Sequence, residues 1–354
     1  MLENNHSPIH FKNLPLAKAA DAIRDAGEPA FRFRQIIKWA YQKRVDSFTL
    51  MKNVSRSTQK KLAGNLSLEK LPLDTVLRSL HGDAIKLGFQ VFDDPYVIEC
   101  VLLIDGDRRT ACLSSQVGCG LGCTFCETGL LGFIRNLTQE EIIGQLIGVN
   151  DYCAEQGDKL VTNIVFMGMG EALANFDNFR SSLAVIMHED CFNIGARRIT
   201  VSTAGVVPSI ERLMAEGLTI GLAISLNSYS NDLRSRIMPI NKKYPIETLV
   251  VIAGRYFKQT GRRVTFEYIV VEGETDTEAA AQALKKTLGS LPCKINLIPI
   301  NPIAGSTAAA PSRRRLIQFA DRLHSFGLAA TVRTSRGSDV CGACGQLTVR
   351  ELRG

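Results

Sequence analysis

Histidines and long apolar runs are both scarce in this sequence. The five histidines among 354 residues stand apart, without the short spacings of a metal-binding motif, so we assign them no role. No apolar run reaches the roughly 20 residues that a membrane-spanning helix needs. The first residues, MLENNHSPIHF, do not have the form of a signal peptide. We therefore expect a cytoplasmic protein that does not enter a membrane.

The remaining composition is ordinary for a soluble globular protein. Hydrophobic residues make up 45% of the chain, enough to bury a core, and its length allows more than one domain. Ten cysteines in a reducing compartment favour metal binding or redox chemistry over a disulfide framework. The net charge of +7 has the sign that favours a polyanionic partner, although many basic proteins bind no nucleic acid.

Residues 1–72 are predicted to form a basic helical domain. We expect helices near residues 21–24, 31–41 and 55–66. One face of the second helix is apolar, with Phe33, Ile36, Ile37, Ala40 and Tyr41. Basic residues follow on its other face and on the third helix, namely Arg32, Arg34, Lys38, Lys43, Arg44, Arg56, Lys60 and Lys61. A solvated face is the simpler interpretation, but acidic residues are sparse here, so we predict contact with a phosphate backbone.

Residues 73–109 are predicted to form a small β extension. Short alternating segments at 75–78 and 95–104 are typical of strands. Glu99 lies inside the second segment, where its carboxylate could simply face solvent.

Residues 110–354 alternate between apolar strands and helices. The expected strands cover 110–114, 162–167, 198–202, 219–226, 263–270, 294–299 and 329–333. The expected helices cover 138–153, 175–188, 208–216, 231–258, 276–288 and 311–326. This α/β pattern predicts a parallel sheet, open or curled into a partial barrel. Ligands of such sheets bind at the carboxyl ends of the strands.

A glycine-rich loop after the first of these strands holds three cysteines in the order C-x3-C-x2-C, namely Cys119, Cys123 and Cys126. Thiolates at this spacing suit three corners of an iron–sulfur cube and leave one iron open. A zinc site usually has two C-x2-C pairs at a characteristic spacing. The only other pair, Cys341 and Cys344, lies near the C-terminus. Zinc and buried free cysteines remain the alternatives to a cluster.

Small polar residues follow several strands. The segment Gly168-Met-Gly170-Glu171 lacks the third glycine of a dinucleotide fingerprint, because position 173 is leucine, and it suits the edge of a small-ligand site better. Ser202, Ser225, Asn227 and Asn301 would form a ring of hydrogen-bonding groups over the barrel mouth, although each one alone could be a helix cap.

The second cysteine centre lies between glycines near the C-terminus. Cys344 in Ala-Cys-Gly-Gln-Leu is a plausible nucleophile, with a redox-active Cys341–Cys344 pair as the alternative. Four further cysteines are expected to be inert, namely Cys100, Cys153, Cys191 and Cys293.

These motifs together resemble the radical SAM RNA methyltransferases of the RlmN/Cfr family. The resemblance is carried by the segments Cys112 to Leu137, FMGMGE at 166–171, STAGVVP at 202–208, MPINKKYP at 238–245, CKINLIP at 293–299 and ACGQL at 343–347. It covers nearly the whole chain, including the basic helical domain. The implied fold is a partial (β/α)6 barrel with a small β extension and an N-terminal helical domain.

The resemblance also implies the cofactors and their ligands. Cys119, Cys123 and Cys126 would hold a [4Fe–4S] cluster whose open iron is chelated by S-adenosylmethionine (SAM). An external electron donor such as flavodoxin would reduce the cluster, and reductive cleavage of SAM would give a 5′-deoxyadenosyl radical. The residues implied to contact SAM are Gly170, Glu171, Ser202, Ser225, Leu226, Asn227 and Asn301.

Three further residues are implied to act in the chemistry. Cys344 would first be methylated by one SAM, and the radical from a second SAM would then activate that methyl group for addition to adenine. Glu99 maps onto the base that deprotonates the adduct. Cys112 would release the RNA by forming a transient disulfide with Cys344, which a thiol reductant such as thioredoxin reduces.

The implied substrate is C2 of an adenine in RNA, namely adenosine 2503 of 23S rRNA, with adenosine 37 of tRNA as a second candidate, and we expect a monomer. The sibling reaction at C8 is the alternative, and an RNA-binding protein with a structural metal site is a more distant one. Asn227 stands where the family commonly has histidine, Ala172 replaces proline in a form associated with the C8 branch, and Cys341 is an additional thiol. The segments TFEYI at 265–269 and CKINL at 293–297 instead look like the C2 branch.

Overall fold

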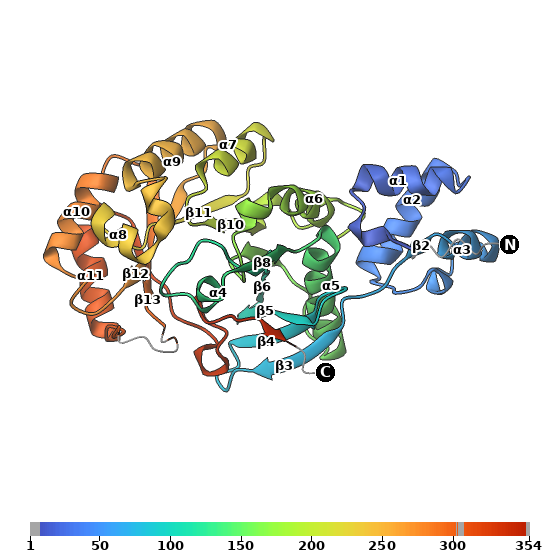
Figure 1. Cartoon of the computed structure of the whole chain (residues 1–354), viewed down its shortest axis with the longest axis horizontal. Helices are drawn as coiled ribbons and strands as arrows, with labels where there is room; N and C mark the ends of the chain where they lie inside the picture. The colour runs from blue at the N-terminus through green and yellow to red at the C-terminus, as the bar shows by residue number, and fades with distance from the viewer. Residues whose placement is uncertain (1–7, 302, 304–307, 352–354) are drawn as a thin grey trace.

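The computed structural model describes residues 8–301, 303 and 308–351, and its centre is one 11-stranded sheet (Figure 1). Along the sheet the order is β14-β13-β12-β11-β10-β9-β6-β5-β4-β3, and β15 pairs with β5 off this path. The strands are β3 Leu73–Arg78, β4 Ala84–Gln90, β5 Tyr96–Asp105, β6 Arg108–Cys112, β9 Asn163–Phe166, β10 Ile199–Thr203, β11 Gly221–Ser225, β12 Val264–Val270, β13 Cys293–Pro299, β14 Ala330–Val332 and β15 Arg350–Glu351.

The seven strands from β6 to β14 are all parallel. Helices connect them and pack outside the sheet, where Figure 1 shows α7, α9, α10 and α11 along its outer face. The helices of this part are α4 Glu127–Leu130, α5 Gln139–Glu155, α6 Phe176–Met187, α7 Val207–Ala215, α8 Asn231–Ile237, α9 Ile246–Thr260, α10 Glu278–Leu288 and α11 Arg313–Ser325. The α/β fold class is therefore confirmed, and all seven strands expected over residues 110–354 are present, with β14 as the last of them.

The single helix predicted over 231–258 is wrong. The chain forms α8, a 3-10 turn over Pro239–Lys242 and then α9. Pro239 and Pro245 explain the interruption, because proline has no N–H to donate and disfavours helical geometry in the residue before it. The break matters for the site because the end of α8 packs against the cysteine loop, where Thr124 N donates to Ile237 O over 3.0 Å.

The antiparallel strands β3, β4 and β5 do not form a separate small sheet. Strand β5 pairs with β6, with Val101 opposite Cys112, so these strands extend the parallel sheet from its first strand. Strand β4 was not predicted from the sequence. It pairs with β5 and sets Gly88 opposite Glu99. The predicted β extension is therefore continuous with the sheet that carries the site.

The N-terminal segment forms the expected helices, which lie beside α5 and α6 in Figure 1. Its elements are β1 Ile9–His10, α1 Leu16–Asp25, α2 Ala30–Ile37, a π-helical turn Lys38–Gln42, α3 Arg56–Ala63 and β2 Leu66–Ser67, which pairs with β1. The predicted apolar face is confirmed, because Ile36, Ile37, Ala40 and Tyr41 are fully buried. This segment also docks on α5, where Gln139 Nε2 donates to Lys12 O over 2.7 Å.

Part of the predicted basic face forms ion pairs with acidic residues of the same protein. Arg34 and Lys38 both form ion pairs with Asp190, which lies between α6 and β10. Arg44 pairs with Asp151 of α5. The basic side chains of α3 are different: Arg56, Lys60 and Lys61 are exposed and have no ion-pair partner among the described residues. These three, rather than Arg34 and Lys38, remain free to meet a phosphate backbone.

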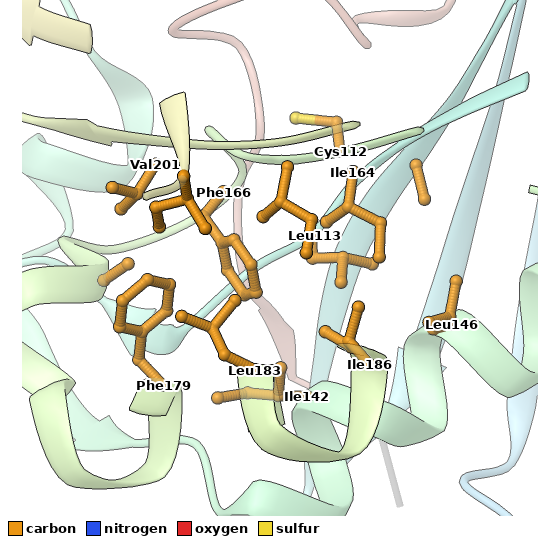
Figure 2. Close-up of a cluster of buried hydrophobic side chains, with 14 of the residues drawn as sticks. Cys112, Leu113, Ile142, Leu146, Ile164, Phe166, Phe179, Leu183, Ile186 and Val201 are labelled. Atoms are coloured by element: carbon orange, nitrogen blue, oxygen red, sulfur yellow. The ribbon is translucent and has the colours of Figure 1, made fainter. Parts of the chain in front are cut away.

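A continuous apolar core lies between the sheet and its helices. Figure 2 shows Ile164 and Phe166 of β9 packed against Ile142 of α5 and Leu183 of α6, with Cys112 at the edge of the cluster. The rings of Phe166 and Phe179 meet edge to face with centroids 4.8 Å apart. Alternation along the chain thus places Leu113 in this core and leaves the Cys112 side chain on the opposite face. No helix of the described residues is long and apolar enough to cross a membrane.

Candidate active site

Two adjoining cavities lie within and above the parallel strands. The inner cavity, of about 570 Å³, is lined by Cys112, Thr265, Asn296 and the C-terminal residues 342–345. The strand-end cavity, of about 180 Å³, is lined by the three loop cysteines and by residues at the carboxyl ends of the strands. Both cavities share Glu267, Arg333 and Cys344 as walls. The structure therefore brings both predicted cysteine centres to one place.

The cysteine loop is held in shape by a short hairpin of β7 Gln116–Gly118 and β8 Phe133–Asn136. Gly118 has a φ of +74°, and a side chain there would collide with the carbonyl oxygen of Gly132. Cys119 N donates to that same oxygen over 2.8 Å, and Cys126 N donates to Cys123 O over 3.3 Å. The tight turn directs all three cysteines toward the strand-end cavity.

The three cysteine residues are partly buried, and burial makes their thiolate forms unfavourable unless a cation binds them. Burial, together with the neighbouring Glu171 and Cys126, raises the pKa of Cys119 to about 11. Burial and the neighbouring Cys126 and Cys119 together raise the pKa of Cys123 well above its usual range. Three such thiols become thiolates together only when positive charge neutralises them, which iron would supply.

The set of donors also bears on the choice between a cluster and zinc. Three thiols line one cavity, and thiolates are the ligands that hold iron–sulfur clusters. A structural zinc site usually takes four protein ligands. The residues present therefore fit a [4Fe–4S] cluster with one open iron.

The predicted ring of polar groups is present at the strand ends. Gly170, Glu171, Ser202, Ser225, Asn227 and Asn301 all line the strand-end cavity. Asn227 adopts a φ of +55° and its Oδ1, buried, has no hydrogen-bond partner among the described residues. Leu226 differs from the rest because its side chain is fully buried, so only its backbone could meet a ligand.

Gly168, Gly170 and Glu171 also stabilise the local fold, a role that was not predicted from the sequence. A side chain at Gly168 would collide with Leu113, and one at Gly170 would collide with Gln116. Glu171 Oε2 accepts the N–H of Ala204 over 2.8 Å, and burial raises the pKa of Glu171 to about 7. The glycine-rich edge thus packs the start of the cysteine loop against β9 as well as facing the cavity.

Arg234 of α8 was not predicted to belong to the site. It is fully buried, and its guanidinium donates to the carbonyl oxygens of Ala204, Ser225 and Leu226 over 2.7–2.9 Å. These carbonyls lie where β10 and β11 end, so Arg234 fixes the floor of the strand-end cavity. Its position in an ordinary amphipathic helix pattern gave no signal of this role.

The C-terminal loop that carries Cys344 lies across the cysteine loop. Gly345 O accepts from Glu127 N over 2.8 Å, and Leu347 O accepts from Thr128 Oγ1 over 2.6 Å. Asn301, predicted as a SAM contact, donates its amide to Cys344 O over 2.9 Å. Cys344 itself remains exposed, in a wall shared by both cavities.

Cys112 and Cys344 face the inner cavity from distant parts of the sequence. All ten cysteines are free thiols, so the structure does not show the predicted disulfide. Burial raises the pKa of Cys112 to about 12, while the charge of Arg333 lowers it. Cys341 is exposed and adopts a φ of +49°, whereas the cavity wall is formed by the residues that follow it.

Glu99 lies beneath the C-terminal loop and does not face solvent. It shares a strand face with Val101 and Leu103, which line the inner cavity. One carboxylate oxygen is 2.9 Å from Lys86 Nζ, and the other accepts the N–H of Thr348 over 3.0 Å. The simple solvated interpretation of this carboxylate is therefore wrong, since only 4% of Glu99 is exposed.

Glu267 and Arg333 are functional candidates that the sequence analysis missed. Glu267 of β12 is 5% exposed, and Arg333 follows β14. Burial raises the pKa of Glu267, and the charge of Arg333 opposes that rise. The signal was present, because Glu267 is a lone carboxylate inside the apolar run of residues 264–270.

Family models and relatives match almost the entire chain. Residues 113–283 match the model of the radical SAM superfamily, and residues 9–68 match that of a ribosomal RNA large subunit methyltransferase N-terminal domain. A dual-specificity RNA methyltransferase RlmN from Desulfotalea psychrophila is 38% identical over 99% of this chain and 98% of its own length. A probable one from Moorella thermoacetica is 42% identical over 91% of this chain and 92% of its own.

A solved structure agrees with the arrangement described above. The crystal structure of a radical SAM methyltransferase from Sphaerobacter thermophilus has a TM-score of 0.90 to this chain. The two are 40% identical in sequence, and the match covers 96% of this chain and 99% of that one. The similarity thus extends over nearly the whole fold.

Proposed function

This chain belongs to the RlmN family of radical SAM RNA methyltransferases, and on that premise we propose that it methylates C2 of adenine in RNA. The proposed substrates are adenosine 2503 of 23S rRNA and adenosine 37 of tRNA. The relatives are named dual-specificity RNA methyltransferases, and for this chain the dual specificity is part of the proposal.

One observation supports the proposal most strongly. Two thiols from distant parts of the sequence, Cys112 and Cys344, line a cavity that shares a wall with the cavity of the three loop cysteines. A structural metal site would need no nucleophile beside it and no second cavity large enough for a base. A methyl-carrying cysteine between a SAM site and an RNA base needs both.

The residues of the strand-end cavity would hold the cofactors. Cys119, Cys123 and Cys126 would bind a [4Fe–4S] cluster, and Gly170, Glu171, Ser202, Ser225, Leu226, Asn227 and Asn301 would surround SAM. When bound, the reduced cluster with SAM supplies radical chemistry that can activate a methyl group toward an adenine carbon too weakly nucleophilic for ordinary transfer. The chain itself keeps Cys344 between the two cavities through Asn301 and Thr128.

Three side chains would complete the reaction. Cys344 would carry the methyl group as a thioether, and Glu99 would accept the proton from the methylated adenine carbon, while the one electron left over from the radical addition would pass to the bound cluster. Cys112 would then attack the Cys344 sulfur, forming an S–S bond as the bond from Cys344 to the RNA methylene breaks. The departing carbon takes the electron pair and a proton, and a dithiol reductant restores both thiols.

The partners follow from the same proposal. The exposed Arg56, Lys60 and Lys61 of α3 would meet RNA phosphates, and the target base would be turned out of its stack into the inner cavity. We place the enzyme in the cytoplasm as a monomer, supplied by a flavodoxin-type electron donor and a thioredoxin-type reductant. The domains would be residues 1–72 for RNA binding, 73–109 carrying Glu99, and 110–354 for the radical chemistry.

Anaerobic reconstitution tests this function. The reconstituted enzyme is expected to cleave SAM, to acquire a methyl group on Cys344 and to produce 2-methyladenosine in RNA, each detected by mass spectrometry. Formation of 8-methyladenosine would assign the chain to the C8 reaction instead. RNA binding without SAM cleavage or Cys344 methylation would leave only a structural metal site.

A further inference from the structure

Glu267 presents a buried carboxylate oxygen that nothing in the described structure binds. The residue is 5% exposed, and its Oε2 has no hydrogen-bond partner among the described residues. A buried polar atom without a partner costs about 1–3 kcal/mol. This acceptor therefore requires a donor from a molecule that enters the site.

The orientation of the carboxylate is fixed from the neighbouring strands. Thr331 Oγ1 donates to Asn296 Oδ1 over 2.7 Å, which leaves the Asn296 amide nitrogen to donate to Glu267 Oε1 over 3.1 Å. In the sheet register, Glu267 stands directly between Ser225 of β11 and Asn296 of β13. These two hydrogen bonds, from Thr331 to Asn296 and from Asn296 to Glu267, fix the position of Oε1 and leave Oε2 without a partner among the described residues.

Glu267 lines both cavities, and its hydrogen-bond partner Asn296 lies on the side where the two thiols meet. Asn296 and Thr265 line the inner cavity together with Cys112 and Cys344, and the hydrogen bond to Asn296 draws Glu267 toward that cavity. Because Cys344 would transfer its carbon to the base and Cys112 would release it, the base must lie in this cavity. Arg333, also in the wall, keeps positive charge near Glu267 and favours its ionised form.

We propose that Glu267 selects adenine as the target base, its Oε2 accepting a hydrogen bond from the 6-amino group in the inner cavity. This inference rests on the proposed function. A 6-aminopurine offers a donor at this position, whereas guanine and hypoxanthine offer a carbonyl oxygen. Two acceptors facing each other in a buried site repel, so a 6-oxopurine would leave both unpaired. Flipped bases are generally read along this edge.

The experiment pairs a change in the enzyme with a change in the base. Three RNAs are compared that carry adenosine, purine riboside or inosine at the target position, with kcat/KM for methylation as the readout. The wild-type enzyme is expected to lose about 10- to 100-fold on purine riboside, which lacks the amino group, and more on inosine. Glu267→Ala is expected to lose a similar factor on adenosine and nothing further on purine riboside.

Two controls keep the test interpretable. Glu267→Gln preserves volume, but Asn296 binds its one acceptor oxygen and leaves the amide NH2 in the place of Oε2. This variant is therefore expected to stay impaired on adenosine and to methylate the inosine RNA better than Glu267→Ala does. Glu274→Ala changes an exposed carboxylate just beyond the same strand and is expected to discriminate among the RNAs like wild type.

Full additivity of the two changes on all three RNAs would overturn the proposal. That result would show that Glu267 and the 6-amino group do not interact, and would assign Oε2 to SAM or to packing. Failure of the wild-type enzyme to methylate any RNA would overturn the proposed function, and this inference with it.

Discussion

Replacing Arg234 with methionine tests how the strand-end cavity is built. The guanidinium is fully buried and donates to the carbonyl oxygens of Ala204, Ser225 and Leu226 over 2.7–2.9 Å, and to Asn241 Oδ1 over 2.9 Å. Methionine fills similar space but donates nothing, so these buried acceptors lose their donor. At the lower limit of about 1 kcal/mol for each unsatisfied group, we expect the free energy of unfolding to fall by about 4 kcal/mol.

Urea unfolding followed by circular dichroism measures this loss, and Arg236→Met is the matched control. Arg236 lies on the same helix but is exposed, so its replacement should change stability by less than about 0.5 kcal/mol. Because the three carbonyls end β10 and β11, we also expect Arg234→Met to weaken SAM binding by at least about tenfold, measured by equilibrium dialysis. Equal stability and equal SAM affinity in the two variants would refute this account of the cavity floor.

Three further predictions concern thiols, acid and charge. Cys112→Ala should accumulate a covalent protein–RNA adduct on denaturing gels, whereas Cys100→Ala, on the opposite face of the neighbouring strand, should not; free RNA alone would refute the resolving role. Burial raises the pKa of Glu140 from 4.5 to about 7, so the folded state binds a proton here more tightly than the unfolded state does. The stability that this proton contributes is lost as pH rises from 4.5 to 7. Relative to Glu140→Gln, the wild type should lose up to about 3 kcal/mol across this range in urea titrations, and an unchanged difference would contradict the burial. Lys60→Ala combined with Lys61→Ala should weaken RNA binding and lower the salt dependence of its affinity, by a slope of about 1 per lost contact; an identical slope would exclude phosphate contacts at α3.

The sequence predicted those parts of the site that depend on local spacing. The cysteine loop, the polar strand ends and the seven parallel strands follow from periodicity and motif spacing, and the structure places them together. The roles of Cys344, Cys112 and Glu99 could be assigned only through the family resemblance. Periodicity gave no means to see that a residue near the C-terminus would pack across a loop more than 200 positions earlier.

Other features were missed because they depend on tertiary contacts. Arg34 and Lys38 looked like a nucleic-acid surface until folding placed Asp190 beside them. Arg234 was not singled out from the sequence, yet it binds carbonyls at two strand ends. Glu267 was the one missed residue with a usable signal, since a lone carboxylate in a buried strand demands a partner.

The central claim is that a methylated Cys344 delivers its carbon to C2 of adenine. Its most direct test is reconstitution with methyl-deuterated SAM, followed by mass spectrometry of the Cys344 peptide and of the RNA nucleosides. The account predicts two deuterium atoms in 2-methyladenosine, because one hydrogen of the methyl group is removed while the carbon is still bound to Cys344. Retention of all three deuterium atoms, or an unmodified Cys344 in an enzyme that still forms 2-methyladenosine, would contradict it.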